Sequence, residues 1–156
     1  LTCGHCSTFH IKTLPQLKKK YIDTGKVQLE FIDYPLDRLA VIAATLARSI
    51  PTKDGYIEAV SILLKKQKQW AYSKNPLNEL QSIAKLFGIS SKKFNDISQN
   101  IPLMQEIVTK MEKESKNFDI NSTPTFIVND KYKISGALSF KDFEKELLKS
   151  INAKKS

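Results

Sequence analysis

The chain has 156 residues, 41% of them hydrophobic and 26% charged, a balance typical of one folded domain or of a core fold with one inserted domain. This composition disfavours disorder, collagen-like repetition and coiled coil, and no apolar run is long enough to cross a membrane. The net charge of +9 comes almost entirely from lysines. They lack the interleaved arginines and aromatics of a nucleic-acid surface, so no nucleic-acid partner is expected.

The first expected element is a helix that begins at Cys3, with apolar residues at helical spacing as far as Tyr21. Pro15 lies inside it and is expected to kink it, because proline has no N–H to donate. Gly25 is expected to end the helix in a left-handed conformation. Residues 27–34 alternate well enough between apolar and polar side chains to predict a strand.

The middle of the chain, from about residue 39 to residue 117, is helical in pattern throughout. Apolar spacing and helix start and stop signals predict five helices, over 39–50, 56–70, 76–87, 90–97 and 102–116. The pattern then changes, because 125–128 and 132–135 are rich in β-branched and aromatic residues. Asn129 and Asp130 between these runs predict a β-hairpin. Ser139 with Asp142 matches a capping box and predicts a last helix. This order indicates an α/β or α+β fold with the helical block inserted.

The two cysteines form a Cys-x-x-Cys motif, Cys3 to Cys6, at the start of the first expected helix. Unpaired N–H groups and the helix dipole favour an anion there, so the thiolate of Cys3 should be stabilised. A structural disulfide would close too short a ring to stabilise the fold much. Zinc needs four ligands, and only His5 and His10 are available besides the cysteines; Cys3, Cys6 and His10 would leave the site one ligand short. Covalent haem needs a histidine where Ser7 stands. Two inert thiols remain possible, but the position favours redox chemistry, with no metal and no cofactor.

A second candidate feature is Pro124, which follows Thr123 and directly precedes the first strand of the hairpin. A proline at this place can be cis, in a tight turn. The alternative is an ordinary trans proline at the start of an edge strand. By itself this residue decides nothing.

Four motifs together resemble those of the DsbA-like thiol–disulfide oxidoreductases: Cys3-Gly4-His5-Cys6, Asp33-Tyr34-Pro35-Leu36-Asp37, Thr123-Pro124-Thr125-Phe126 and Gly136-Ala137-Leu138-Ser139-Phe140. The resemblance extends over essentially the whole chain. It implies an α/β fold with a thioredoxin-like sheet and an inserted α-helical domain. The thioredoxin-like domain would comprise 1–36 and 118–156, and the inserted helical domain 37–117.

The resemblance also implies a role for each residue of the site. Cys3 would be the exposed nucleophile and Cys6 its buried partner, with Gly4 and His5 as the dipeptide that tunes the redox potential. Thr123 would precede a cis Pro124, and the two would help to bind the substrate backbone. The Gly-His dipeptide, and threonine before the proline, are similar to isomerase-type members, so the direction of exchange stays open.

The function implied is the introduction of disulfide bonds into exported proteins by Cys3 and Cys6. Its partners would be unfolded or folding proteins with cysteines, and a membrane quinone-linked thiol oxidase that reoxidises the pair. The compartment would be the bacterial periplasm or another extracytoplasmic space, with the signal peptide outside this chain. Isomerase or reductase action on the same site is one alternative. A non-catalytic peptide-binding module on a thioredoxin scaffold is another.

A thioredoxin fold has a central strand that leads into the Cys-x-x-Cys helix, whereas only two residues precede Cys3 here. We therefore expect this chain to lack at least one N-terminal strand, which would lie between 27–34 and 125–128 and pair with both. A chain extended at the N-terminus should show more β signal in the far ultraviolet and a more cooperative, higher melting transition. Equal stability and cooperativity of the short chain would contradict this expectation.

Overall fold

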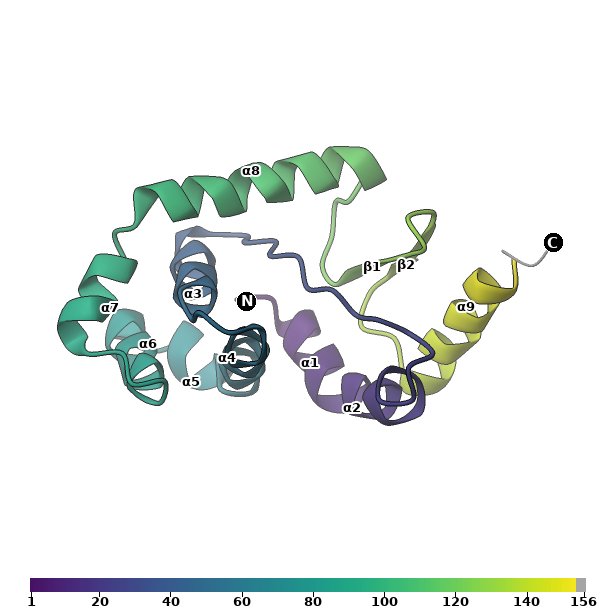
Figure 1. Cartoon of the computed structure of the whole chain (residues 1–156), viewed down its shortest axis with the longest axis horizontal. Coiled ribbons are helices and arrows are strands. Elements are labelled where there is room, and N and C mark those ends of the chain that lie inside the picture. The colour runs from purple at the N-terminus through teal and green to yellow at the C-terminus, as the bar shows by residue number, and fades with distance from the viewer. Residues whose placement is uncertain (154–156) are drawn as a thin grey trace. The chain divides into compact units, whose positions relative to one another are not determined.

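Figure 1 shows the computed structural model of the chain, which describes residues 1–153. The chain forms two compact units. The first, here called the helical unit, comprises Leu1–Thr2 and Asp33–Lys113. The second, here called the thiol unit, comprises Cys3–Ile32 and the chain from Glu114 onward. The two units are defined by the contacts within each of them. The domain ranges expected from the sequence, 1–36 with 118–156 and 37–117, stay a prediction.

The predicted first helix is present but is divided into three consecutive segments: α1 (Gly4–Lys12), α2 (Leu14–Leu17) and η1 (Lys18–Ile22), the last a π-helical turn. The break falls at Thr13, just before Pro15, and not at the proline itself. Pro15 occupies the first turn of α2, where its missing N–H would have no partner in any case. Gly25 has φ +70°, so its predicted left-handed conformation is confirmed.

The strand predicted over residues 27–34 is wrong. Residues 27–35 are neither helix nor strand, and Figure 1 draws them as a long irregular connection. A strand exists only where a neighbouring backbone completes its ladder of hydrogen bonds, and alternation of side chains does not supply that neighbour. In the part of the chain that the structure describes, the sheet has only the two strands of the hairpin. Val27 instead packs against the core of the thiol unit.

The helical block follows the predicted order of helices: α3 (Arg38–Arg48), α4 (Lys53–Lys65), α5 (Gln67–Ala71), α6 (Pro76–Lys85), α7 (Ser91–Ile97) and α8 (Ile101–Phe118). One helix expected over 56–70 is two, because the backbone leaves helical geometry at Lys66. Trp70 on α5 is fully buried, and its indole N–H donates to the carbonyl of Leu63 at 2.8 Å. Among the described residues, no helix combines the length and apolar character needed to span a bilayer.

An ion pair joins the connection before α3 to the helices of its own unit. The Nε–H of Arg48 donates to Oδ2 of Asp33 at 2.7 Å, and the Asp33 side chain is only 9% exposed. The hydroxyl of Tyr56 donates to the same carboxylate oxygen at 3.4 Å, and the guanidinium lies 4.1 Å from the centre of the Tyr56 ring. A buried carboxylate is tolerated only with such partners, so this cluster fixes where the connection meets α3 and α4.

The predicted hairpin is confirmed. Strands β1 (Thr125–Val128) and β2 (Tyr132–Ser135) pair antiparallel, with Phe126 opposite Ile134. Asn129 and Asp130 both have positive φ, 53° and 55°, a conformation that these two residue types tolerate better than most. The turn was predictable because it depends only on these two neighbouring residues.

Three phenylalanines join the hairpin to the helices of the thiol unit. The ring of Phe9 on α1 lies 4.4 Å from that of Phe126 on β1 and 5.2 Å from that of Phe143. Phe126 and Phe143 meet edge to face at 4.8 Å. Each such pair contributes about 0.5–1.5 kcal/mol beyond the burial of its area. This contact sets the position of α1, and hence of the cysteines at its start, relative to the hairpin.

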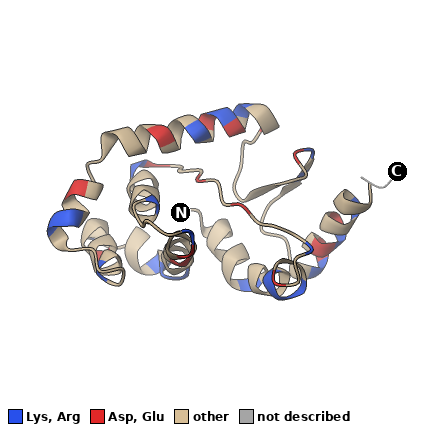
Figure 2. Cartoon of the chain, in the orientation of Figure 1, with Lys and Arg blue, Asp and Glu red and all other residues tan. Residues whose placement is uncertain are grey.

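Charged side chains are interspersed along the exposed helix faces. Figure 2 shows basic and acidic residues alternating along α8, where Lys110, Glu112, Lys113, Glu114 and Lys116 follow one another. The same mixture is present on α9 (Phe140–Asn152), the last helix. Charges of both signs along a helix are typical of a solvated helix surface.

The last helix begins with the predicted capping box. The hydroxyl of Ser139 accepts a hydrogen bond from the N–H of Asp142 at 3.2 Å and donates to the Asp142 carboxylate at 2.6 Å. Replacing Ser139 by alanine leaves that N–H without its partner, so Ser139→Ala should lower the free energy of unfolding by about 1 kcal/mol. Urea unfolding followed by circular dichroism measures this. Ser122→Ala, at an exposed serine that caps no helix, is the control, and equal midpoints for the two variants would contradict the prediction.

Candidate active site

Cys3 is the residue immediately before α1, as the sequence predicts for a thiol at a helix start. Its backbone is extended, with φ −72° and ψ 118°, and its carbonyl accepts the N–H of Ser7 at 3.2 Å. This is the geometry of a residue that caps a helix N-terminus, where side-chain atoms can reach the unpaired N–H groups of the first turn. Cys6 lies in that first turn, and the two cysteines are in the dithiol form.

The loop before the hairpin contacts Cys3 from the far end of the chain. The Cys3 thiol donates to the carbonyl oxygen of Thr123 at 3.5 Å, across 120 residues of sequence. The peptide bond between Thr123 and Pro124 is cis. Pro124 is buried, and its carbonyl accepts the N–H of Gly136 at 2.8 Å, which ties this loop to the end of β2. The structure therefore brings Cys3, Thr123 and Pro124 together within the thiol unit.

The pKa of Cys3 lies below its ordinary value because hydrogen bonds outweigh burial. Partial burial raises the pKa of the thiol. Hydrogen bonds from the Thr123 side chain, from the backbone and thiol of Cys6 and from the backbone of His5 lower it by more. A thiolate can only accept, so it uses these donors, while the protonated thiol donates to the Thr123 carbonyl. The stabilised form is the nucleophile.

The pKa of Cys6 is shifted in the opposite direction from that of Cys3. Burial and the negative charge on the neighbouring Cys3 thiolate are the largest causes, and they raise the pKa of Cys6 to about 12. A thiolate already at Cys3 makes a second charge close by unfavourable, and the hydrogen bond between the thiols keeps the proton on Cys6. Once Cys3 has lost its proton, the pair therefore holds one thiolate and one thiol until the pH approaches the pKa of Cys6, about 12.

The dipeptide between the cysteines is exposed. No described heavy atom outside its neighbours lies within 4 Å of where a Cβ on Gly4 would stand, so packing does not require glycine there. His5 reaches the sulfur of Cys3 through its backbone, a contribution that reasoning from residue types alone does not reveal. The redox-tuning role expected of Gly4 and His5 stays a prediction.

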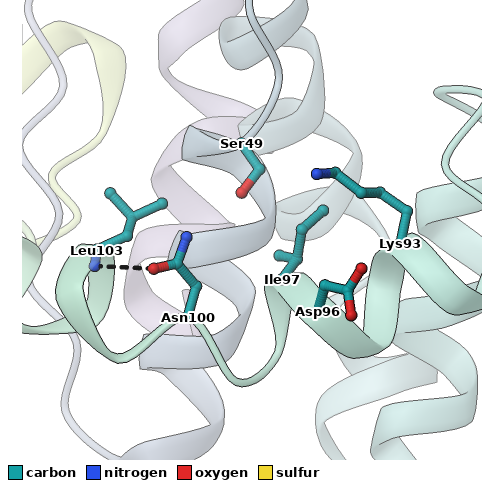
Figure 3. Close-up of a pocket in the computed structure, with 6 residues that line it drawn as sticks. All are labelled: Ser49, Lys93, Asp96, Ile97, Asn100 and Leu103. Carbon is teal, nitrogen blue, oxygen red and sulfur yellow. Dashed lines mark hydrogen bonds between the residues drawn. The ribbon is translucent and has the colours of Figure 1, made fainter.

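Two other features bear on the choice of site. Within residues 1–153, no group of three or more His, Cys, Asp or Glu side chains is placed to hold a metal ion. A separate hollow of about 290 Å³ lies in the helical unit, and it is lined by Ser49, Lys93, Asp96, Ile97, Asn100 and Leu103 (Figure 3). There the side-chain oxygen of Asn100 accepts the N–H of Leu103 at 3.2 Å and so caps the start of α8.

A sequence model described as thioredoxin matches residues 1–149, which is nearly the whole chain. The chain belongs to the thioredoxin family. The crystal structure of alpha-DsbA1 from Wolbachia pipientis superimposes with a TM-score of 0.82 at 29% identity, over 97% of this chain and 84% of that one. The resemblance to DsbA-like proteins and the thioredoxin-like fold with an inserted helical domain are thereby confirmed.

Two relatives extend this comparison to sequence. One from Rickettsia typhi, named as a protein-disulfide oxidoreductase, is 31% identical over 82% of this chain and 47% of its own length. One from Buchnera aphidicola, named thiol:disulfide interchange protein DsbA, is 24% identical over 85% of this chain and 63% of its own length. The chain spans about half the length of the first of these curated relatives.

The contact between Thr123 and Cys3 generates a test of the low pKa. Thr123→Val removes the side-chain hydrogen bond that lowers the pKa of Cys3, so that pKa should rise towards the ordinary value. The rate of alkylation by iodoacetamide, measured against pH with each site identified by peptide mass, reports it. At pH 7 only Cys3 should react in the unmodified chain, because the pKa of Cys6 is about 12.

Thr125→Val is the matched control, since the Thr125 hydroxyl donates to the Ser122 carbonyl at 2.7 Å. The control should leave the alkylation profile of Cys3 unchanged. A Cys3 pKa that does not move in Thr123→Val, or that moves equally in both variants, would contradict the role given to Thr123.

Proposed function

We propose that this chain carries the redox site of a thiol–disulfide oxidoreductase that introduces disulfide bonds into exported proteins. The observation that carries the proposal is the opposite perturbation of two neighbouring thiols at one helix start. Cys3 has its pKa lowered by hydrogen bonds and Cys6 has its pKa raised to about 12. A structural or inert pair has no need of this asymmetry. The names of the Rickettsia and Buchnera relatives support the same class of reaction.

The oxidised site would act through a mixed disulfide. A substrate thiolate attacks the sulfur of Cys3, so that a substrate–Cys3 bond forms, the Cys3–Cys6 bond breaks and Cys6 leaves with the electron pair. Cys6 then takes up a proton, as its high pKa favours. A second substrate thiolate attacks the substrate sulfur of the mixed disulfide, and Cys3 leaves as a thiolate. The substrate dithiol is oxidised by two electrons and the site is reduced by two.

The low pKa of Cys3 favours the direction of oxidation. A stabilised Cys3 thiolate stabilises the reduced site, and a site that is stable when reduced is oxidising when it carries the disulfide. It also makes Cys3 a good leaving group in the second step. Isomerase or reductase action on the same residues is the second candidate, and the Gly-His dipeptide and Thr123 before the cis proline favour it.

The remaining parts of the proposal concern partners and place. The substrates would be unfolded or folding proteins with cysteines, bound along their backbone beside Thr123 and Pro124. Reoxidation of the pair would come from a membrane quinone-linked thiol oxidase. The compartment would be the bacterial periplasm or another extracytoplasmic space.

The direction of exchange is tested by the reduction potential of the Cys3–Cys6 pair. The chain is equilibrated in glutathione buffers, and the thiols are trapped by alkylation. The reduction potential should be about −120 mV for an oxidase and about −270 mV for a reductase, and it should lie between these values for an isomerase. A value near the reductase limit would overturn the proposed direction but not the site.

The chemistry itself is tested with a reduced, unfolded protein that contains two cysteines. Cys3→Ala should abolish its oxidation by the disulfide form of the site. Cys6→Ala is first converted to a mixed disulfide between Cys3 and glutathione. A form of the unfolded protein with only one cysteine should then displace glutathione and accumulate as a mixed disulfide through Cys3, visible as one added mass that dithiothreitol removes. Binding of the unfolded protein that persists in Cys3→Ala, together with no thiol exchange by the unmodified chain, would show a non-catalytic peptide-binding module.

A further inference from the structure

The loop that carries Thr123 is anchored on both sides of that residue, and all of its anchors lie in the thiol unit. Residues 119–124, here called the Thr123 loop, join the end of α8 to β1 (Figure 1). The thiol unit contains Cys3 and the whole chain from Glu114 onward, so it includes the last turn of α8, this loop and the hairpin. The anchors of the loop can therefore be related to Cys3 within one compact unit.

The side of the loop next to the hairpin is anchored at Pro124. Its carbonyl accepts the N–H of Gly136, the residue after β2, at 2.8 Å. The bond from the Thr125 hydroxyl to the Ser122 carbonyl spans Thr123 but attaches the loop to no other element, so it moves with the loop. The backbone after Thr123 is therefore fixed by the hairpin.

The other side of the loop is tied to the last turn of α8 by Ser115. The helix ends at Phe118, and Asp119 has a positive φ of 48°. The N–H of Ile120 donates to the Ser115 carbonyl at 2.9 Å, a bond that closes many helix C-termini. The Ser115 hydroxyl donates to the carbonyl of Ile120 at 2.7 Å. One helical residue thus holds both polar backbone groups of Ile120, and the second bond requires its hydroxyl.

Lys133 on β2 holds the same side of the loop from the hairpin. Its Nζ donates to the Asp119 carbonyl at 2.6 Å. The Asp119 carboxylate lies farther away, at 3.6 Å, and its side chain is 95% exposed, so the ion pair contributes little. The contact that places the loop is the one to the backbone. A charged donor makes a stronger hydrogen bond than a neutral one, and a cation suits the carbonyls at a helix C-terminus.

The hairpin uses its two faces for different contacts. Successive side chains of a strand point to opposite faces, so the exposed Lys133 and the buried Ile134 lie on different sides. Phe126, which pairs with Ile134, packs against Phe9 of α1. One face thus fixes the hairpin against α1, and Lys133 on the other face holds the start of the Thr123 loop. The same two strands therefore place both the cysteine helix and the loop.

These anchors matter because Thr123 contacts Cys3 with its backbone and its side chain. Its carbonyl accepts the Cys3 thiol at 3.5 Å, and its side chain hydrogen-bonds the Cys3 sulfur. With Pro124 fixed, a change in ψ of Thr123 moves its N–H and its side chain together. If Asp119 and Ile120 were released, the backbone before Thr123 could turn in this way, and its hydroxyl would spend less time on the Cys3 sulfur.

We propose that Ser115 and Lys133 are positioning residues for thiol exchange, and that they act by holding the start of the Thr123 loop so that Thr123 reaches the Cys3 sulfur. This inference rests on the proposed function for its biological meaning, but the coupling does not depend on the direction of exchange. Both side chains act on backbone carbonyls and not on the sulfurs, so neither is a catalytic residue.

Ser115→Ala and Lys133→Met test the inference. Ser115→Ala removes the hydroxyl and leaves the backbone bond to Ile120, and Lys133→Met keeps a long side chain but loses the ammonium. Each variant should raise the pKa of Cys3. A rise of half a unit lowers the rate of alkylation of Cys3 by iodoacetamide roughly threefold at a pH below that pKa. The rate is measured against pH, with each site identified by peptide mass.

Ser150→Ala and Lys131→Met are the matched controls. The Ser150 hydroxyl also donates to a helix carbonyl of the thiol unit, that of Glu146 at 2.8 Å. Lys131 carries the same charge in the turn of the same hairpin, but its Nζ lies 5.4 Å from the centre of the Tyr132 ring. Both controls should leave the alkylation of Cys3 unchanged. Equal slowing in a variant and its control would trace the effect to lost stability or lost charge and would overturn the inference.

The double variant Thr123→Val with Lys133→Met asks whether Lys133 acts through Thr123. Once the Thr123 hydroxyl is gone, the loop has no such bond left to position. Adding Lys133→Met should then cause no further rise in the Cys3 pKa beyond that of Thr123→Val alone. Effects that add would show that Lys133 acts on Cys3 independently of Thr123, and the inference would be overturned.

A purely structural role for the two residues gives a different result. In that case Ser115→Ala and Lys133→Met would lower the melting temperature and leave the Cys3 pKa of the folded protein unchanged. An unchanged Cys3 pKa in either folded variant would overturn the inference. Failure of the proposed function is seen separately, as absence of thiol exchange in the unmodified chain, while the titration of Cys3 still decides the role of the loop anchors.

Discussion

The site depends on the competition between burial and hydrogen bonding at the sulfur of Cys3. Burial alone would raise the pKa of this thiol and leave it inert at neutral pH. The hydrogen-bond donors around the sulfur, from Thr123, Cys6 and His5, lower the pKa by more than burial raises it. None of them is a strong interaction by itself, and together they require that a helix start and a loop 120 residues away meet at one atom. Much of the thiol unit serves to keep them together.

The three-phenylalanine contact performs that task. Phe9 is about one turn along α1 from Cys6, and its ring packs on Phe126, three residues after Thr123. Phe143 on α9 contacts both rings from the other end of the chain. A shift of α1 against the hairpin would open closely packed aromatic contacts before it moved Cys3 away from Thr123. The aromatic contacts of the core therefore also hold Cys3 close to Thr123.

The features that the sequence predicted well are those whose cause is local. The turn at Asn129 and Asp130, the cap at Ser139 and the thiol at the start of α1 each follow from a few neighbouring residues. The strand over 27–34 failed because a ladder needs a distant partner that alternation cannot specify. The hydrogen bond that the side-chain amide of Gln67 donates to the Leu1 carbonyl, across 66 residues of sequence, could not be predicted for the same reason. The family resemblance bridged part of this gap, since it placed Thr123 and a cis Pro124 in the same site as Cys3 when no spacing rule could.

The dipeptide between the cysteines is exposed and stands apart from the core that positions α1. No packing atom stands where a Cβ on Gly4 would project, so residues there can change without disturbing the core. The Phe9 contact that positions α1 does not involve this dipeptide. The predicted tuning of the redox potential by Gly4 and His5 would therefore act on residues that the packing of the thiol unit does not need. A substitution there would change the surroundings of the Cys3 sulfur while Phe9, Phe126 and Thr123 keep their contacts.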